Sequence, residues 1–268
     1  TFIEFMRNKE FDDSTIRKNI SSLSSFYNFH QNRGNISYNP FQVVMDEIKL
    51  DDPDNNRRHI PLPDMRLFVQ NLQHPLKNAV IMTLLKTGIR NGELCNLDLR
   101  DINIEHKKLD DIYNYEPRAE IKSRPNSIYI DSNIAVGDVI NNEKRTAGNK
   151  RVKSTISPID NELRYSLLRY LAVRPNTDHL DSNPLFVSER DGCSRFKKNG
   201  LTKRIVRCVK DEGWYSKEDD LTTNVTPHYF RHYFTSHNRQ DLGKPVVKYI
   251  RGDVGGDIID HYTHEWSM

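Results

Sequence analysis

The first part of the chain shows the spacing of apolar residues that is typical of an α-helix. Apolar side chains recur three or four positions apart at Ile16, Ile20, Leu23 and Tyr27. Asp13 or Ser14 is a suitable N-terminal cap, and Gly34 is a suitable end. We expect residues 1–34 to be helical, either as the end of a small helical domain or as a hairpin packed on the main domain.

A polar stretch follows this helical segment. Residues 45–60 are rich in Asp, Asn and Arg and are interrupted by Pro53, a composition that is typical of a linker. We therefore expect two domains, residues 1–55 and 56–268.

Helical spacing returns after the linker. The apolar face of the first helix would hold Leu62, Met65, Phe68, Val69 and Leu72. Pro75 opens a second helix and Gly88 ends it, because glycine tolerates the positive φ of that position. Arg90 then lies in the first turn of a short helix, where free backbone N–H groups also attract anions. Glu93, one turn further, is placed to hold this guanidinium, unless the two form only a weak surface pair.

Strand patterns replace the helical ones in residues 102–158. The expected strands are at 102–104, 126–130, 134–140 and 155–159. The turn 141–153 is basic and rich in Gly and Asn, so it either reaches phosphates or is simply solvated.

Helices dominate the rest of the chain, apart from a short strand at 185–187. Asp160 caps one helix, and the helix 201–210 carries a basic face opposite an apolar one. Further helices are expected at 226–234, 244–251 and 257–264. The expected fold class is therefore mixed α+β and mainly α, with a small antiparallel β-sheet.

The composition limits the possible functions. The chain has 268 residues, 36% of them hydrophobic, and no run of the roughly 20 apolar residues that a membrane helix needs. Its 40 Lys and Arg nearly balance 37 Asp and Glu, so the net charge of +3 is only weak evidence for a nucleic-acid partner. Three cysteines without metal-type spacing fit a cytosolic protein. The first residue is Thr1 rather than Met, so we expect a piece of a longer protein.

The stretch 226–234 carries the clearest candidate chemistry. His228, Arg231 and His232 lie three or four residues apart, so they share one helical face and form a cluster of anion-binding donors. A polar rim over an aromatic core would show the same pattern, so this cluster alone is not diagnostic.

Three motifs and their order along the chain resemble the catalytic domain of the tyrosine recombinases, the phage-integrase family. They read TGIRNGEL at 87–94, TPHYFRH at 226–232 and IDHYTH at 259–264. The likeness covers roughly residues 60–268, and residues 149–151 and 252–253 look more like archaeal members. It implies a helical catalytic domain preceded by a partial DNA-binding (core-binding) domain at residues 1–55. It further implies a site-specific recombinase that integrates or excises a mobile element.

The resemblance implies a role for each matching residue. Arg90 and Arg231 would stabilise the negative charge of the transition state, and His228 would add a hydrogen bond. Tyr262 would attack phosphorus and form a 3′-phosphotyrosyl link. Cations close to the tyrosine would favour its phenolate.

In this family a lysine of a β-hairpin turn protonates the leaving 5′-oxygen. The candidates in this chain are Lys144, Lys150 and Lys153. Lys150 is favoured, because its eight-residue interval to Pro158 matches the family, and Lys144 is second. Glu93 and His232 would support the site, and the chemistry implies no metal and no cofactor.

One position departs from the family. Nine residues before the tyrosine, the family usually has a His or Trp that donates to a non-bridging oxygen, and this chain has Asp253. An aspartate there would repel phosphate unless it is protonated or turned away, so the donor is missing or supplied from elsewhere. His261 and His264 flank Tyr262 and are either replacement donors or exposed helix residues.

The resemblance also implies the partners. We expect double-stranded DNA attachment sites, a homo-tetramer on DNA, no membrane, and a cytoplasmic, nucleoid-associated location. The alternatives are a type IB topoisomerase-like enzyme and a non-catalytic DNA-binding relic or accessory protein of the same fold. Sequence-independent relaxation of supercoils by a monomer would distinguish the topoisomerase.

Overall fold

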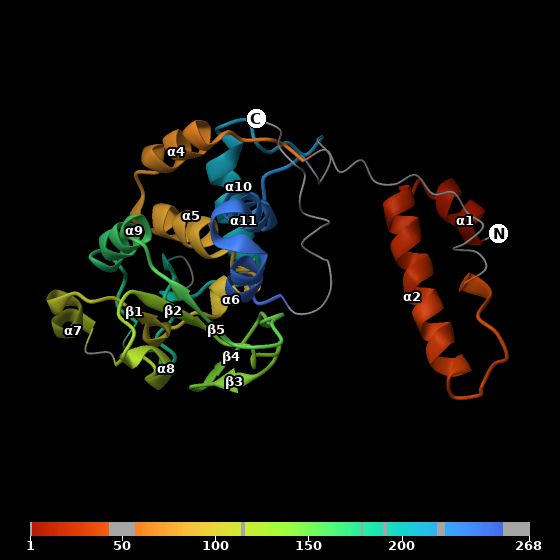
Figure 1. Cartoon of the computed structure of the whole chain (residues 1–268), viewed down its shortest axis with the longest axis horizontal. Helices are drawn as coiled ribbons and strands as arrows, with labels where there is room; N and C mark the ends of the chain where they lie inside the picture. Colours follow the sequence, from red (N-terminus) through yellow and green to blue (C-terminus); the bar gives the residue numbers. More distant parts are fainter. Residues whose placement is uncertain are drawn as a thin grey trace. The chain divides into compact units, whose positions relative to one another are not determined.

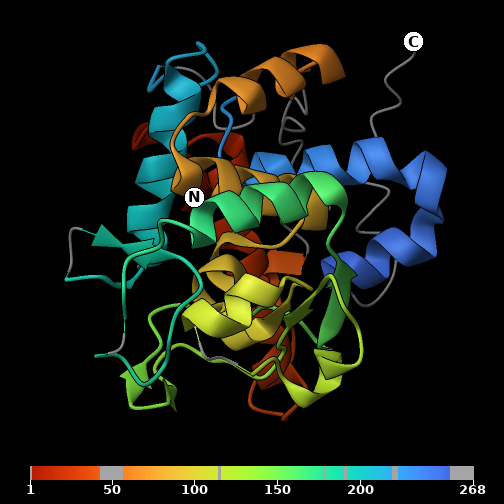
Figure 2. The same ribbon diagram turned by 90° about the vertical axis from the view of Figure 1, so that its left-hand side faces the viewer.

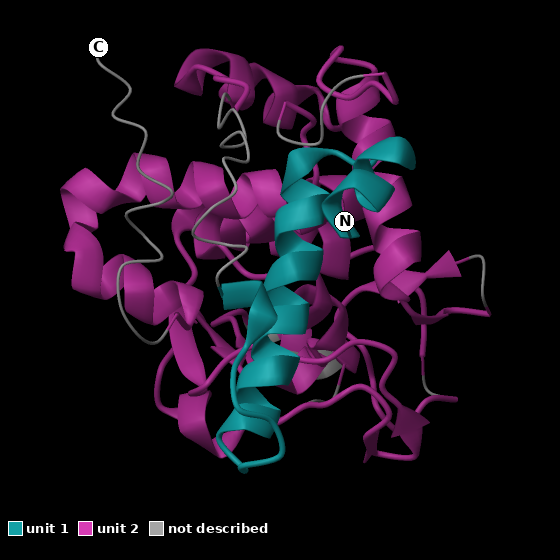
Figure 3. Ribbon diagram, turned by 90° about the vertical axis from the view of Figure 1, so that its right-hand side faces the viewer, with its two compact units in different colours: residues 1–56 teal, residues 57–268 magenta. Residues whose placement is uncertain are grey.

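The computed structural model of the chain describes residues 2–42, 57–113, 116–177, 179–189, 192–218 and 223–253 (Figures 1 and 2). The chain divides into two compact units, Thr1–Asn56 and Arg57–Met268, which Figure 3 shows in different colours. No helix within the described ranges combines the length and the apolar character needed to cross a membrane.

Two helices, α1 (Phe2–Asn8) and α2 (Asp13–Gln31), are described in the first unit. α2 begins after Asp12, whose side chain accepts a hydrogen bond of 2.7 Å from the backbone N–H three residues further on. Asp13 and Ser14 belong to the helix itself, so the predicted cap is wrong. The buried core of this unit is small and contains Ile3, Met6, Ile16 and Ile20.

The second unit is built around α5 (Pro75–Thr87), most of whose residues are buried. α5 packs against α9 (Asn161–Leu171) and α11 (Pro227–Arg251). The other helices that contact α5 or the site are α4 (Leu62–Asn71), α6 (Asn91–Asn96) and α10 (Lys198–Lys210). Because other helices pack around α5 on several sides, α5 is apolar over most of its circumference.

The end of α5 sets the position of the candidate site. Gly88 has a left-handed backbone with a φ of 57°, as expected for the residue that follows a helix. A Cβ atom there would lie 2.6 Å from Cδ1 of Phe234, so the glycine lets α5 end directly against α11. The carbonyl of Gly88 accepts a hydrogen bond of 2.6 Å from Arg231 of α11, which ties the two helices together.

A three-stranded antiparallel sheet lies in the same unit. Its strand order is β1 (Ile102–Asn103), β2 (Ser127–Ile130) and β5 (Thr155–Pro158). Ile128 of β2 is paired with β1 on one side and with β5 on the other. Two short hairpins are formed by β3 (Val139–Ile140) with β4 (Glu143–Lys144) and by β6 (Val187–Ser188) with β7 (Ser194–Arg195). The predicted fold class, mainly helical with a small antiparallel sheet, is confirmed.

Several predicted elements differ from the structure. The region predicted as strands and turns also contains two helices, α7 (Lys107–Tyr113) and α8 (Ala119–Lys122), and η1 (Leu99–Asp101) lies directly before it. These helices have too few turns to show a helical period in the sequence. The predicted strand 134–140 is shortened to β3, because the carboxylate of Asp138 accepts a hydrogen bond from the backbone N–H of Ala135 in a turn.

Other differences concern the ends of elements. The basic helix α10 begins three residues earlier than predicted, and the short strand at 185–187 begins at Val187. The predicted helix 244–251 continues α11 after a kink at Gly243, which has a φ of 74° and a ψ of 154°. The predicted helix 257–264 lies outside the described residues.

Candidate active site

A groove of about 1080 Å³ in the second unit brings most of the predicted site residues together. It is bordered by α6, the turn at 146–150, and the first turns of α10 and α11. The predicted residues that line it are Arg90, Lys150, His228 and Arg231. Three segments that are far apart in the sequence therefore contribute side chains to one surface.

Arg90 is positioned by Glu93. The backbone N–H of Arg90 donates to Oε2 of Glu93 (2.9 Å), and its Nη1 donates to Oε1 (3.0 Å). The side chain of Glu93 is fully buried, whereas that of Arg90 is 28% exposed to the groove. Because the carboxylate of Glu93 accepts hydrogen bonds from both the backbone and the guanidinium of Arg90, the arginine side chain has little freedom to turn away.

Arg231 is the more deeply buried of the two arginines, at 1% exposure. Its Nη1 donates to the carbonyls of Gly88 (2.6 Å) and Arg251 (3.0 Å), and its Nη2 donates to Asp253 (2.5 Å). Burial, together with the charges of Arg251 and Arg90, lowers the pKa of Arg231 to about 9. The guanidinium is therefore held rigidly in a site that already contains other positive charges.

Asp253 is turned toward the arginines. Its Oδ1 accepts hydrogen bonds from Nη2 of Arg90 (2.8 Å) and Nη2 of Arg231 (2.5 Å), and its Oδ2 lies 2.9 Å from Nε of Arg251. From the sequence, an aspartate at this position is expected to repel a phosphate unless it is protonated or turned away. In the structure the carboxylate lies between three guanidinium groups, which attract it.

The two histidines of the motif have different surroundings. His228 is exposed to the groove, whereas His232 is 5% exposed, and their ring centroids lie 4.5 Å apart with the rings almost perpendicular. Loss of hydration, followed by the charge of Arg231, lowers the pKa of His228 to about 4. Loss of hydration, followed by the charge of Arg57, lowers the pKa of His232 to about 2. Both rings are therefore neutral near pH 7 and can act only as neutral hydrogen-bonding groups.

Lys150 is exposed on a turn that is anchored on both sides. Asn149 receives a hydrogen bond from the side chain of Asn96 (2.8 Å) and donates to the carbonyl of Asp131 (2.7 Å). Arg151 is 5% exposed and places its Nε 3.2 Å from Oε2 of Glu93. Asn149 and Lys150 both line the groove, and the lysine is the more exposed of the two. Its backbone is held in place by its neighbours.

The other lysine candidates lie elsewhere. Lys144 is exposed on β4, and neither Lys144 nor Lys153 is among the described residues that line the groove. Tyr262, with its neighbours His261 and His264, lies outside the described residues.

Sequence reasoning missed two residues of this cluster, Arg151 and Arg251. Among the described residues, four guanidinium groups, at Arg90, Arg151, Arg231 and Arg251, form ion pairs with two carboxylates, Glu93 and Asp253. In this described part of the cluster, guanidinium groups therefore outnumber carboxylates. Neither missed arginine had a signal in the sequence beyond its place in a basic segment.

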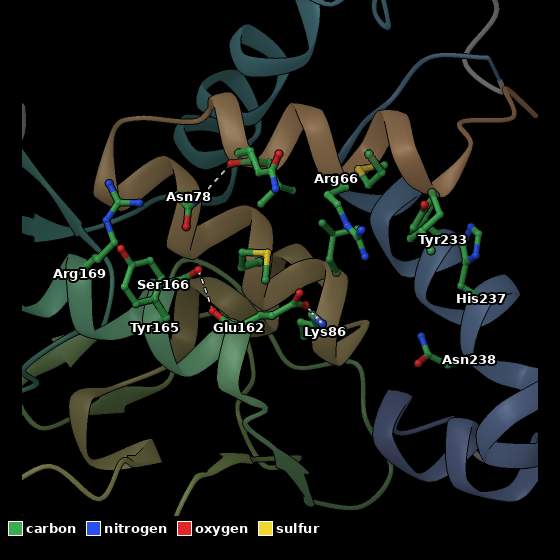
Figure 4. Close-up of a pocket in the computed structure, with 16 residues that line it drawn as sticks. Arg66, Asn78, Lys86, Glu162, Tyr165, Ser166, Arg169, Tyr233, His237 and Asn238 are labelled. Atoms are coloured by element: carbon green, nitrogen blue, oxygen red, sulfur yellow. Dashed lines mark hydrogen bonds and ion pairs between the residues drawn. The ribbon is translucent and has the colours of Figure 1, made fainter.

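Figure 4 shows another groove, of about 540 Å³, between α4, α5, α9 and α11. Lys86 of α5 forms ion pairs with Asp160 (2.7 Å) and Glu162 at the start of α9. Asn78 of α5 donates a hydrogen bond to the carbonyl of Val69 in α4 (3.0 Å). None of the predicted site residues is among the described residues lining this groove, so the candidate chemistry belongs to the first one.

The fold and the first groove define the class of protein. A mainly helical unit presents fixed guanidinium groups, a neutral histidine and an exposed lysine to one surface, and such donors suit a phosphodiester. These features define the class as a mainly helical protein with a site suited to a phosphate group.

Comparison with known sequences finds similarity to tyrosine recombinases. No protein-family model matches the chain. Tyrosine recombinase XerC of Thermodesulfovibrio yellowstonii is 24% identical over 263 residues, which cover 94% of this chain and 71% of that protein. Tyrosine recombinase XerA of Pyrococcus horikoshii is 29% identical over 164 residues, which cover 60% of this chain and 41% of that protein.

Solved structures have the same fold. The Tn1549 transposon integrase in complex with circular intermediate DNA matches with a TM-score of 0.68 and 20% identity, over 98% of this chain and 79% of the integrase. A lambda integrase dimer bound to a COC′ core site matches with a TM-score of 0.65 and 12% identity, over 100% and 80% of the two chains. The chain is similar in sequence to tyrosine recombinases over almost its whole length, and it has the fold of the tyrosine integrases.

Proposed function

We propose that the chain is a site-specific DNA recombinase that cleaves and rejoins DNA through a covalent bond to Tyr262. The observation that carries the proposal is the groove that Arg90, Lys150, His228 and Arg231 share. Sequence similarity to tyrosine recombinases supports it, and so do structural neighbours that are integrases bound to DNA. The biological use we propose is integration or excision of a mobile element.

The two arginines would bind the non-bridging oxygens of the scissile phosphate. Their Nη2 atoms already converge on a single oxygen, Oδ1 of Asp253, at 2.8 Å and 2.5 Å. Donors that are fixed before the reaction need no rearrangement when negative charge develops in the transition state. His228, neutral because its pKa is lowered to about 4, would add a hydrogen bond without adding charge.

The cleavage step exchanges one bond to phosphorus for another. Tyr262 gives its phenolic proton to solvent, and the phenolate oxygen bonds to phosphorus while the bond from phosphorus to O5′ breaks. Neighbouring guanidinium groups favour the phenolate, since a free tyrosine has a pKa of about 10. The leaving O5′ takes a proton from Lys150. Attack by a 5′-hydroxyl reverses the step, so the phosphotyrosine conserves the energy of the broken bond.

The general acid is assigned to Lys150 because its position is restricted. Asn149 and Arg151 anchor the backbone on its two sides, and its own side chain is exposed in the groove. A proton donor must reach the leaving oxygen at hydrogen-bonding distance, and an anchored turn satisfies this requirement better than the exposed strand that carries Lys144.

The basic face of α10 would extend the DNA contact. A cavity of about 580 Å³ along this helix is lined by Lys197, Lys198, Lys203, Arg204 and Arg207, among others. Lys198 also lines the active-site groove, so the two positive surfaces are continuous. Binding to phosphates through such side chains would weaken steeply with salt. We assign residues 1–55 to a partial core-binding domain and expect a homo-tetramer on DNA, by analogy with family members that assemble on their sites.

A finer classification, integrase of the archaeal type, rests on short segments. They are the turn at 149–151 and residues 252–253, where aspartate stands in place of the usual His or Trp. The similarity to XerA of Pyrococcus horikoshii is consistent with this subgroup.

The decisive experiment is a trapping assay. The purified protein is mixed with a nicked DNA duplex that contains the joined ends of its host element, so that cleavage releases a short strand and prevents religation. We expect a covalent protein–DNA adduct on a denaturing gel, and none with Tyr262→Phe. The matched control is Tyr249→Phe, which changes an exposed tyrosine of α11 and should form the adduct normally.

Each other outcome selects a different function. An adduct that persists in Tyr262→Phe would assign the nucleophile elsewhere. Relaxation of a supercoiled plasmid without the element ends would indicate a topoisomerase. DNA binding without any adduct or relaxation would indicate a non-catalytic relic.

A further inference from the structure

Asp253 occupies the position toward which the two site arginines point. Nη2 of Arg90 and Nη2 of Arg231 both donate to its Oδ1, and Arg251 forms an ion pair with its Oδ2. The carboxylate is 9% exposed, so these contacts are largely shielded from water. A carboxylate and a phosphate present the same kind of oxygen acceptors to a guanidinium, so both compete for the same donors.

The backbone before Asp253 is held on two sides. Nη1 of Arg231 donates to the carbonyl of Arg251 (3.0 Å), and Nη1 of Arg151 donates to the carbonyl of Ile250 (3.2 Å). Gly252 has a φ of 67°, and a Cβ atom there would lie 2.6 Å from Nη1 of Arg151. Because the backbone is fixed so closely, the direction of the Asp253 side chain results from the fold and is not that of a loose loop residue.

The charge of the cluster explains why an acidic residue is tolerated here. Burial and the charges of Arg251 and Arg90 lower the pKa of Arg231 to about 9, whereas the charge of Asp253 acts in the opposite direction and favours the charged guanidinium. Removing Asp253 would leave four guanidinium groups with Glu93 as the one carboxylate that the described contacts provide. An anion between Arg90 and Arg231 therefore stabilises the folded protein before any DNA is bound.

We propose that Asp253 is a placeholder for the DNA phosphate. In the free protein its carboxylate occupies the space between Arg90 and Arg231, and it yields this space to a phosphate when DNA binds. Arg251 provides the position to which the displaced carboxylate can turn, because it already contacts the second oxygen at 2.9 Å. The role of the phosphate as the scissile one rests on the proposed function, whereas the competition itself requires only an anion and the two arginines.

The placeholder has a consequence for DNA cleavage. A phosphate gains the contacts of Arg90 and Arg231 only after the carboxylate has given them up, so the net affinity for any phosphate is reduced. Bound DNA that is anchored elsewhere, for example by the basic face of α10, can supply the missing free energy. The site would therefore reject isolated phosphates and accept a phosphate that is delivered by a longer duplex.

Inorganic phosphate is a suitable probe of this competition. Melting temperatures are measured for the wild type, Asp253→Asn, Asp253→His and the exposed control Asp241→Asn, at constant ionic strength with and without phosphate. We expect both Asp253 variants to melt below the wild type without phosphate. Phosphate at about ten times its Kd should then raise their melting temperatures by about 3–5 °C, and those of the wild type and the control much less.

The response must also depend on the arginines. Adding Arg231→Met to Asp253→Asn should abolish the effect of phosphate, which localises the anion to this site. An equal response in the wild type and in Asp253→Asn would overturn the proposal. It is also overturned if neither Asp253 variant folds or regains stability in phosphate, because a phosphate should replace the missing carboxylate.

The two proposals fail independently. Tyr262→Phe should keep the wild-type response to inorganic phosphate, since the tyrosine takes no part in the competition. A missing covalent adduct would refute the recombinase mechanism and leave the placeholder intact. An unchanged phosphate response in Asp253→Asn would refute the placeholder and leave the trapping assay unaffected.

Discussion

Glu93 is the residue whose replacement tests the arrangement of the site most directly. Its buried carboxylate accepts two hydrogen bonds from Arg90, and its Oε2 lies 3.2 Å from Nε of the buried Arg151. Glu93→Gln keeps the shape of the side chain and removes the charge. The amide can keep one accepting oxygen, but its NH₂ group then faces a donor.

The expected cost follows from the burial of Glu93 and Arg151, whose side chains are both fully buried. Removing one partner of a buried ion pair typically destabilises a protein by about 3–5 kcal/mol, because the other charge is left without compensation. The retained amide oxygen places Glu93→Gln at the lower end, about 3 kcal/mol. The same change should impair DNA cleavage, since Arg90 loses the contact that orients it.

Urea unfolding of the second unit measures this cost, with Glu162→Gln as the matched control. Glu162 pairs with Lys86, but its side chain is 66% exposed, so its loss should cost less than about 1 kcal/mol. If Glu93→Gln is no more destabilising than Glu162→Gln, the carboxylate does not neutralise the cluster and the reasoning is refuted.

A double-mutant cycle identifies which arginine is responsible. Arg151→Met removes the buried guanidinium next to Glu93 and keeps much of its apolar volume. The double variant Glu93→Gln/Arg151→Met should be less destabilised than the sum of the two single variants by about 1–3 kcal/mol. Strict additivity would mean that Glu93 acts on Arg90 alone.

Two further predictions concern the general acid Lys150 and the buried His232. Lys150→Ala should slow cleavage by about 10²–10⁴-fold, whereas Lys144→Ala should not. A substrate with a 5′-bridging sulfur needs no proton donor and should restore the Lys150→Ala rate; without rescue, the lysine has another role. The pKa of His232 is lowered from 6.5 to about 2 in the folded protein. Between these two pH values the unfolded chain binds a proton at this residue and the folded chain does not, so the stability falls as the pH drops below 6.5. By pH 5 the share of His232 in this loss should be about 2 kcal/mol relative to pH 8, in addition to the share of His228. His232→Asn should remove its share from the free energy of unfolding in urea, and an unchanged pH slope would contradict the shifted pKa.

Local signals in the sequence account for many of the secondary elements. Pro75 and Gly88 mark the start and the end of α5, and Asp160 caps α9, because these residues act on the backbone within a few positions. Short helices such as α7 and α8 were not predicted, since their stability comes from packing on the rest of the unit.

Some residues of the candidate site were predictable from the sequence and others were not. Motif order was sufficient to choose Arg90, His228 and Arg231, and the structure places all of them on one groove. The partners of Asp253 were not predictable. They come from α6 and from both ends of α11, and a helical period relates only residues on one element.

Two adjacent pairs in the basic turn show what the sequence determined and what it left to the tertiary structure. Lys144 and Arg145 are neighbours, as are Lys150 and Arg151, and composition marks all four only as basic. In each pair the lysine is exposed and the arginine is buried against carboxylates, Asp98 for Arg145 and Glu93 for Arg151. The sequence by itself determined the family motifs and the helical framework. Only packing between distant segments decided which charges are buried, because the free energy of a charge depends on the groups that surround it in space.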